Sequence, residues 1–292
     1  MNKIKENHKY KDSVFVDIFM NDVDSKERLL SIYNALYHKN YKLNEVKLET
    51  FKVDSTLYLN FRNDVSFTIN DKLIMFFEHQ STINKNMPLR MLMYLGRAYE
   101  KIVPTKDRYK RELVKIPTPE FYVFYNGKAE LPKEEILKLS DSFKMNEEKI
   151  FLELKVRVIN INLNKKHKIL QECNILNEYM KFVSKVEEFK SKNINNPIKE
   201  AIKYCIEHNI LSEYLKKNGS EVENMLIAEY DYETDITVQR EEASKEAEEK
   251  RKIKDAKILM DFCNDDEVIS KKMELDLEKV KELRKEWKKD KK

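Results

Sequence analysis

Two acids and an amide, closely spaced, are the residues of this sequence best suited to chemistry. Thirteen residues separate Asp64 from Glu78, and Gln80 follows two positions later. Two carboxylates held about 5 Å from a phosphate would each repel it by about 3 kcal/mol at an effective dielectric of about 20. A divalent cation between them reverses that sign and can acidify a bound water into a nucleophile. The trio therefore indicates a Mg²⁺-type site rather than a metal-free one.

A β-hairpin is the element expected to position these residues. Apolar and polar residues alternate over 65–69, and a short apolar run follows at 73–77, which together predict two strands joined by a tight turn. Side chains alternate across a strand, so Glu78 and Gln80 would share one face. In such a hairpin Asp64 would lie beside Glu78, at the end of the ladder away from the turn.

Several segments carry a resemblance to a known family. The spacing Asp64…Glu78-x-Gln80 resembles the signature of the PD-(D/E)XK nuclease superfamily, in the variant where Gln replaces the motif lysine. Three further segments resemble the Rpn family of recombination-promoting nucleases and transposases: Tyr10–Phe19, with its D-x-x-F-x-x-x-F pattern; Glu78-His79-Gln80-Ser81 followed by Arg90–Tyr94; and Gly219–Asp231. The resemblance covers residues 8 to 235.

The resemblance implies a fold, an activity and a set of site residues. It implies an α/β fold, with a restriction-endonuclease-like mixed sheet core flanked by helices. The implied activity is that of a metal-dependent DNA endonuclease that hydrolyses phosphodiester bonds and promotes recombination. Asp64 and Glu78 would be catalytic residues and ligands of a divalent cation such as Mg²⁺, and Gln80 would be a third catalytic residue. Asp12 matches the N-terminal segment of the family and is a further candidate ligand.

A helix after the hairpin supplies two more candidates. Pro88 favours a helix start, and Arg90 and Tyr94, four residues apart, would share one face of that helix. They would brace a site carboxylate or contact DNA, although Arg90 could equally be an ordinary surface cation. Two other N-terminal acids, Asp17 and Glu27, also lie in a segment expected to be helical. For each N-terminal acid taken singly, a solvated helix face is the favoured alternative to a metal site.

The chain is expected to have three parts. Residues 1–167 would form the nuclease-like core, with further extended segments at 42–52, 118–125 and 154–162. Residues 168–235 show helical spacing of apolar residues and would form a helical subdomain. Residues 236–292 would form a charged helical tail with a helix-turn-helix-like end, in which Glu274 stands where such turns usually have glycine. DNA contact and self-association both remain candidate roles for this tail.

Composition limits the classes of function. The net charge of +4 is dispersed, so composition alone does not announce a nucleic-acid-binding protein. The three cysteines form no C-x-x-C pair, which argues against a cysteine zinc site and suits a reducing cytoplasm. No apolar run suggests a signal peptide or a membrane span. The expected partners are DNA and, as a second candidate, another copy of the chain. The alternative to the nuclease is a catalytically weak, transposon-derived DNA-binding or interaction protein.

Overall fold

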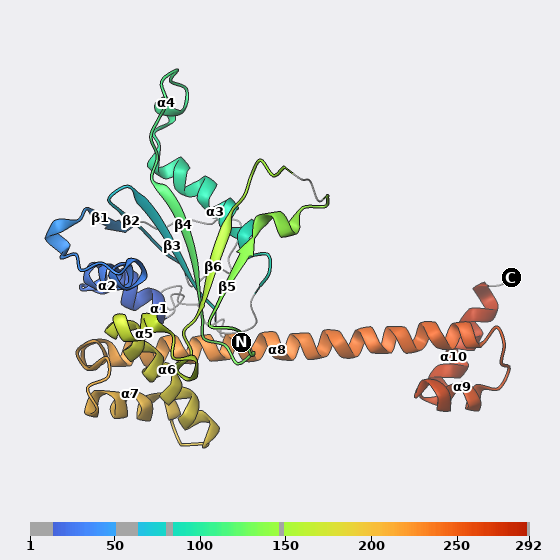
Figure 1. Ribbon diagram of the computed structural model, residues 1–292. Helices are drawn as coiled ribbons and strands as arrows, with labels where there is room; N and C mark the ends of the chain where they lie inside the picture. Colours follow the sequence, from blue (N-terminus) through green and yellow to red (C-terminus); the bar gives the residue numbers. More distant parts are fainter. Residues whose placement is uncertain (1–13, 51–63, 80–83, 146–148, 291–292) are drawn as a thin grey trace. The chain divides into compact units, whose positions relative to one another are not determined.

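The computed structural model describes residues 14–50, 64–79, 84–145 and 149–290. The chain divides into two compact units, Met1–Ala228 and Glu229–Lys292. The first unit is a mixed α/β structure built on a six-stranded sheet, and the second is helical (Figure 1). Within the described residues, no helix combines the length and apolar composition needed to cross a membrane.

The sheet of the first unit has the strand order β1-β2-β3-β4-β6-β5. Strand β3 runs parallel to β4, and β4 runs parallel to β6, whereas the pairs β1–β2, β2–β3 and β5–β6 are antiparallel. The strands are β1 (Leu48–Thr50), β2 (Asp64–Ile69), β3 (Lys72–His79), β4 (Thr118–Tyr125), β5 (Glu134–Lys138) and β6 (Lys155–Asn160). The expected mixed sheet is therefore present.

Helices cover both faces of the sheet. On one face, α3 (Met87–Ile102) buries Met87, Met91, Tyr94 and Ala98 against alternate residues of β3, β4, β5 and β6. On the other face lie α1 (Val14–Val16), η2 (Asp17–Asn21), α2 (Ser25–Tyr37), α5 (Lys168–Glu172) and α6 (Asn174–Ser191) (Figure 1). There the ring of Phe15 lies 6.2 Å from that of Phe124 and 5.5 Å from that of Tyr179. Aromatic contacts of this kind add to the apolar burial that holds the layers together.

Local sequence explains where several of these elements begin and end. Asn70 adopts the left-handed conformation (φ 50°) that the tight turn between β2 and β3 requires. Pro88 occupies the first turn of α3, where a missing N–H does no harm. Two expectations were incomplete. Residues 43–45 form a 3₁₀ turn (η3, Leu43–Glu45) before the short β1, because the Glu45 carboxylate accepts a hydrogen bond from the Lys42 N–H at 2.8 Å. The second is strand β5, which the sequence pattern did not predict.

The remaining helices of the first unit follow the sheet in sequence. Helix α7 (Pro197–Glu207) packs with α6, and α8 (Ser212–Leu259) begins in the first unit and continues into the second. The connections include the four-residue helix α4 (Thr105–Arg108) and the short 3₁₀ turns η4 (Leu139–Ser142) and η5 (Leu163–Lys165). Helices thus occupy the region after residue 168 in which the sequence predicted them.

The second unit is a small helical unit with its own apolar core. It contains the last part of α8, together with α9 (Asp266–Met273) and α10 (Leu277–Asp290). Its core consists of Ala256, Met260, Ile269, Leu275, Val280 and Leu283. The Asp276 carboxylate accepts a hydrogen bond from the Glu278 N–H at 2.7 Å and so caps α10. Glu274 ends α9 in the left-handed conformation. A short turn thus joins α9 to α10, and both helices contribute to the same apolar core.

Candidate functional site

The carboxyl ends of the three parallel strands β3, β4 and β6 lie side by side at one end of the sheet. His79 is paired with Tyr125 at the end of β3 and β4, and Tyr125 is paired with Asn160 at the end of β6. Crevices outside the carboxyl ends of parallel strands are the usual ligand sites of open α/β sheets. This end of the sheet is therefore the candidate functional site, and Glu78 lies at this end.

Buried amides organise this end of the sheet on the β4 and β6 side. Asn160 is only 1% exposed, and its side-chain amide donates to the Leu131 carbonyl at 3.2 Å. The Asn160 side-chain oxygen accepts the backbone N–H of Asn162 at 3.2 Å and its side-chain amide at 3.0 Å. Asn162 also donates to the Gly127 carbonyl at 3.0 Å. These bonds tie the loop after β4 to the end of β6 and give this end of the sheet a fixed polar frame.

The backbones of the two predicted acids, Asp64 and Glu78, lie at this same end of the sheet. Asp64 is the first residue of β2 and is paired with Phe77 of β3, so Glu78 stands one register position further along. Glu78 itself is paired with Phe124 of β4. The side chains of Asp64 and Glu78, and the whole of Asp12 and Gln80, lie outside the described residues. Among the residues that the structure does describe, no group of three or more His, Cys, Asp or Glu could hold a metal ion.

Arg90 and Tyr94 lie on α3, which covers one face of the sheet. Tyr94 is 5% exposed and belongs to the same apolar cluster as Leu73, Met75 and Tyr125. Arg90 lies one helical turn earlier and is half-buried. The Tyr94 side chain is therefore part of the apolar packing between α3 and the sheet.

Of the two alternative N-terminal acids, Asp17 has a structural role. Its carboxylate accepts a hydrogen bond from the hydroxyl of Tyr214, on the first turn of α8, at 2.6 Å. Burial raises the pKa of Tyr214, and the neighbouring Asp17 carboxylate raises it further, so the phenol stays protonated as the donor. Asp17 therefore anchors α8 to the N-terminal segment. Glu27 is exposed on α2.

The buried Asp22 carboxylate strengthens the same anchor. It lies 3.0 Å from Arg28 and accepts a hydrogen bond from the Asn218 side chain of α8 at 3.2 Å. Burial alone would raise the pKa of Asp22, but the Asp24 backbone N–H, Arg28 and Asn218 outweigh that effect and lower it. Asp22 therefore stays ionised and holds α8 against α2.

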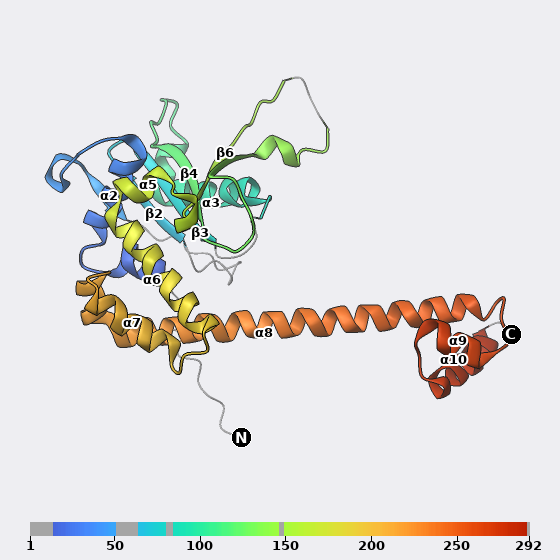
Figure 2. The ribbon, with the colours of Figure 1, turned by 60° about the horizontal axis from the view of Figure 1, so that its bottom comes forward.

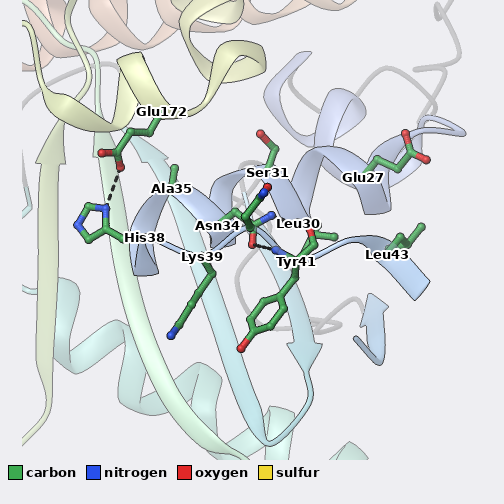
Figure 3. A pocket seen from close by; sticks show the side chains of 11 residues that line it. Glu27, Leu30, Ser31, Asn34, Ala35, His38, Lys39, Tyr41, Leu43 and Glu172 are labelled. Atoms are coloured by element: carbon green, nitrogen blue, oxygen red, sulfur yellow. Dashed lines mark hydrogen bonds and ion pairs between the residues drawn. The ribbon is translucent and has the colours of Figure 1, made fainter. Parts of the chain in front are cut away.

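A polar pocket lies between α2, the loop that follows it and α5 (Figure 3). Its volume is about 540 Å³, and its polar lining includes Glu27, Asn34, His38, Tyr41 and Glu172. His38 Nδ1 lies 3.0 Å from the Glu172 carboxylate, and Asn34 bonds both the N–H and the carbonyl of Tyr41. These contacts fix the loop after α2. Of the residues weighed from sequence, the pocket contains only Glu27.

Overall composition does not reveal a basic segment that begins at the end of α3 and continues to β4. Residues 101–116 contain six Lys or Arg and only two Asp or Glu, so the charge is less dispersed than composition suggested. A count of charge in short windows would have found it.

A comparison of this chain with known proteins gives no assignment: no family model, no curated protein and no solved structure matches it.

Proposed function

We propose that this chain is a metal-dependent DNA endonuclease of the Rpn type, which hydrolyses phosphodiester bonds. In this proposal Asp64 and Glu78 hold a divalent cation such as Mg²⁺, and Gln80 orients the attacking water. The residue pattern comes from the sequence, and the fold supports it at the level of a mixed α/β sheet flanked by helices.

The register of the β2–β3 hairpin is the observation that carries the proposal. It brings the backbone of Asp64 to within one position of Glu78, beside the carboxyl ends of β3, β4 and β6. Neighbouring positions of a regular ladder alternate between its two faces. In a regular ladder Asp64 shares the face of its partner Phe77 and Glu78 belongs to the other face, so the two carboxylates could hold one ion only by reaching around the end of the strand.

The chemistry of the donor set fits the ion. Carboxylate oxygens are the ligands that Mg²⁺ prefers, and two of them supply the negative charge that a divalent cation neutralises. A bound ion would supply charge stabilisation at the phosphate and a more acidic water. Gln80 can donate and accept hydrogen bonds but carries no charge, so its contribution would be to orient groups rather than to neutralise the phosphate.

A plasmid-cleavage assay tests the proposal. The wild-type protein should nick or linearise DNA with Mg²⁺ and stop in excess EDTA. Asp64→Asn and Glu78→Gln keep the shape of each side chain but remove its charge, and each should reduce cleavage to the level seen in chelator. Asp71→Asn is the matched control, because Asp71 is exposed at the opposite end of the same hairpin.

The outcomes separate the two candidate functions. Full cleavage in EDTA would refute the metal-dependent mechanism, and wild-type rates in both acid variants would show that the site is misplaced. A protein that binds DNA but never cleaves it would support the alternative, a catalytically weak DNA-binding protein.

A further inference from the structure

A local excess of positive charge lies at the end of α3 and in the loop before β4. Residues 101–116, called the basic hairpin below, contain six of the 56 Lys and Arg residues and two of the 52 Asp and Glu residues. This segment has four more basic than acidic side chains, an excess that residues 284–292 also carry. Such local excess is the electrostatic mark of a surface that binds an anionic polymer.

The hairpin projects from the first unit into solvent. It connects the end of α3 to the start of β4, and both ribbon views show it extending past that end of the sheet (Figures 1 and 2). Tyr109 is 84% exposed, and the six cations of the hairpin are all exposed. Tyr109, between Arg108 and Lys110, therefore places an exposed aromatic ring among exposed cations.

Hydrogen bonds hold the base of the hairpin in place. The Tyr99 hydroxyl donates to the Pro117 carbonyl at 2.7 Å, and the pKa of Tyr99 is raised by burial, which keeps it protonated. Arg108 folds back and donates to the carbonyls of Val103 at 3.2 Å and Glu100 at 2.7 Å, at the end of α3. The hairpin is thus a supported projection.

Of the six cations of the hairpin, Lys101, Arg108 and Lys110 have internal interactions, and three are left over. Asp107 is engaged by Lys110 at 2.6 Å, and Arg108 caps α3. Within the part of the chain that the structure describes, Lys106, Arg111 and Lys115 form no ion pair. Exposed charges without internal partners can meet an external anion without first breaking a bond.

From these features we infer that the basic hairpin is a nucleic-acid contact surface. Lys106, Arg111 and Lys115 bind backbone phosphates, and Tyr109 stacks on an unpaired base. This inference rests on the proposed function and adds a second contact with the nucleic acid, because the hairpin precedes β4 and so lies at the end of the sheet opposite Glu78. Nucleic acid is the proposed partner because the exposed ring of Tyr109 lies between cations, an arrangement that pairs stacking with phosphate contacts. Binding to an anionic membrane, for which the exposed Leu113 and Ile116 would be the apolar contacts, is the outcome that the test must exclude.

Binding is measured by fluorescence anisotropy with a labelled duplex and a labelled single strand of the same sequence. All titrations contain EDTA and use the Asp64→Asn/Glu78→Gln background, so that binding is scored without cleavage. The variant Lys106→Gln/Arg111→Gln/Lys115→Gln should raise the Kd for duplex about 10²-fold at 0.1 M salt, and the log–log salt slope should fall by about 3. Tyr109→Ala should weaken single-strand binding roughly tenfold, and Tyr109→Phe should retain it.

A second triple variant controls for net charge. Lys199→Gln/Lys203→Gln/Lys216→Gln removes three exposed lysines of α7 and α8 and should leave the Kd and the salt slope unchanged. Equal effects of the two triple variants would overturn the inference, since only overall charge would then matter. It would also be overturned if the hairpin variant lost binding to phosphatidylserine vesicles but kept binding to nucleic acid. Far-UV circular dichroism verifies that all variants are folded.

Discussion

Glu274 sits in a backbone conformation that favours glycine, and replacing it should stabilise the second unit. It follows α9 with φ 51° and ψ 43°, and its N–H bonds the Ser270 carbonyl. The Leu275 N–H also donates to the Ser270 carbonyl, at 3.1 Å, so two backbone hydrogen bonds hold the turn. A side chain in this region crowds its own carbonyl, whereas glycine does not.

The expected magnitude follows from three opposing effects. Relief of the left-handed conformation contributes about 1–2 kcal/mol, and the greater freedom of unfolded glycine costs about 0.5–1 kcal/mol. The ion pair of Glu274 with Lys252, at 3.0 Å, is also lost, but a salt bridge at the surface contributes little. Glu274→Ala loses the same ion pair and keeps the crowded backbone. Glu274→Gly should therefore be more stable than Glu274→Ala by about 0.5–1 kcal/mol.

Hydrogen exchange by mass spectrometry is the suitable assay, because a global melt would mix the two units. Peptides covering 266–283 should exchange about two- to fivefold more slowly in Glu274→Gly than in Glu274→Ala. Peptides from the sheet of the first unit should not change and serve as the internal control. Equal exchange in the two variants would refute the strained turn at Glu274.

Three further predictions concern the first unit. Burial raises the pKa of Glu120, but hydrogen bonds from Lys72, Tyr37 and Tyr122 outweigh burial and lower the pKa below its usual 4.5. The stability that the ionised carboxylate contributes is therefore present above that pH and is lost as the pH falls. The urea midpoint of Glu120→Gln should depend less on pH below about 4.5 than that of the wild type. Tyr214→Phe removes the bond to Asp17 and should lower the free energy of unfolding of the first unit by about 1.5–3 kcal/mol, measured by urea titration; an unchanged midpoint would contradict the anchor. Gln80→Ala should reduce DNA cleavage about 10²-fold in the plasmid assay, and an unaffected rate would make Gln80 purely structural.

Sequence patterns were sufficient for most elements of the sheet and its helices. The alternation over 65–69 and the apolar run at 73–77 predicted β2 and β3, because burial of one or both faces of a strand leaves a periodic record in the chain. Pro88 and Pro197 each lie in the first turn of a helix, as local backbone chemistry requires. Strand β5 was missed because Glu134 and Glu135 open it at the edge of the sheet, where only one neighbour pairs with it.

Contacts between distant residues were decided only by the tertiary structure. Asp17 and Tyr214 are 197 positions apart, and nothing in the local pattern around Asp17 distinguishes an anchor for α8 from a metal ligand. The charges of the basic hairpin could be counted in the sequence, yet their availability could not. Arg108 and Lys110 are occupied by internal contacts, while Lys106, Arg111 and Lys115 are exposed without an ion pair among the described residues. Composition records which charges a chain carries, but the fold determines which of them are neutralised internally and which face a partner.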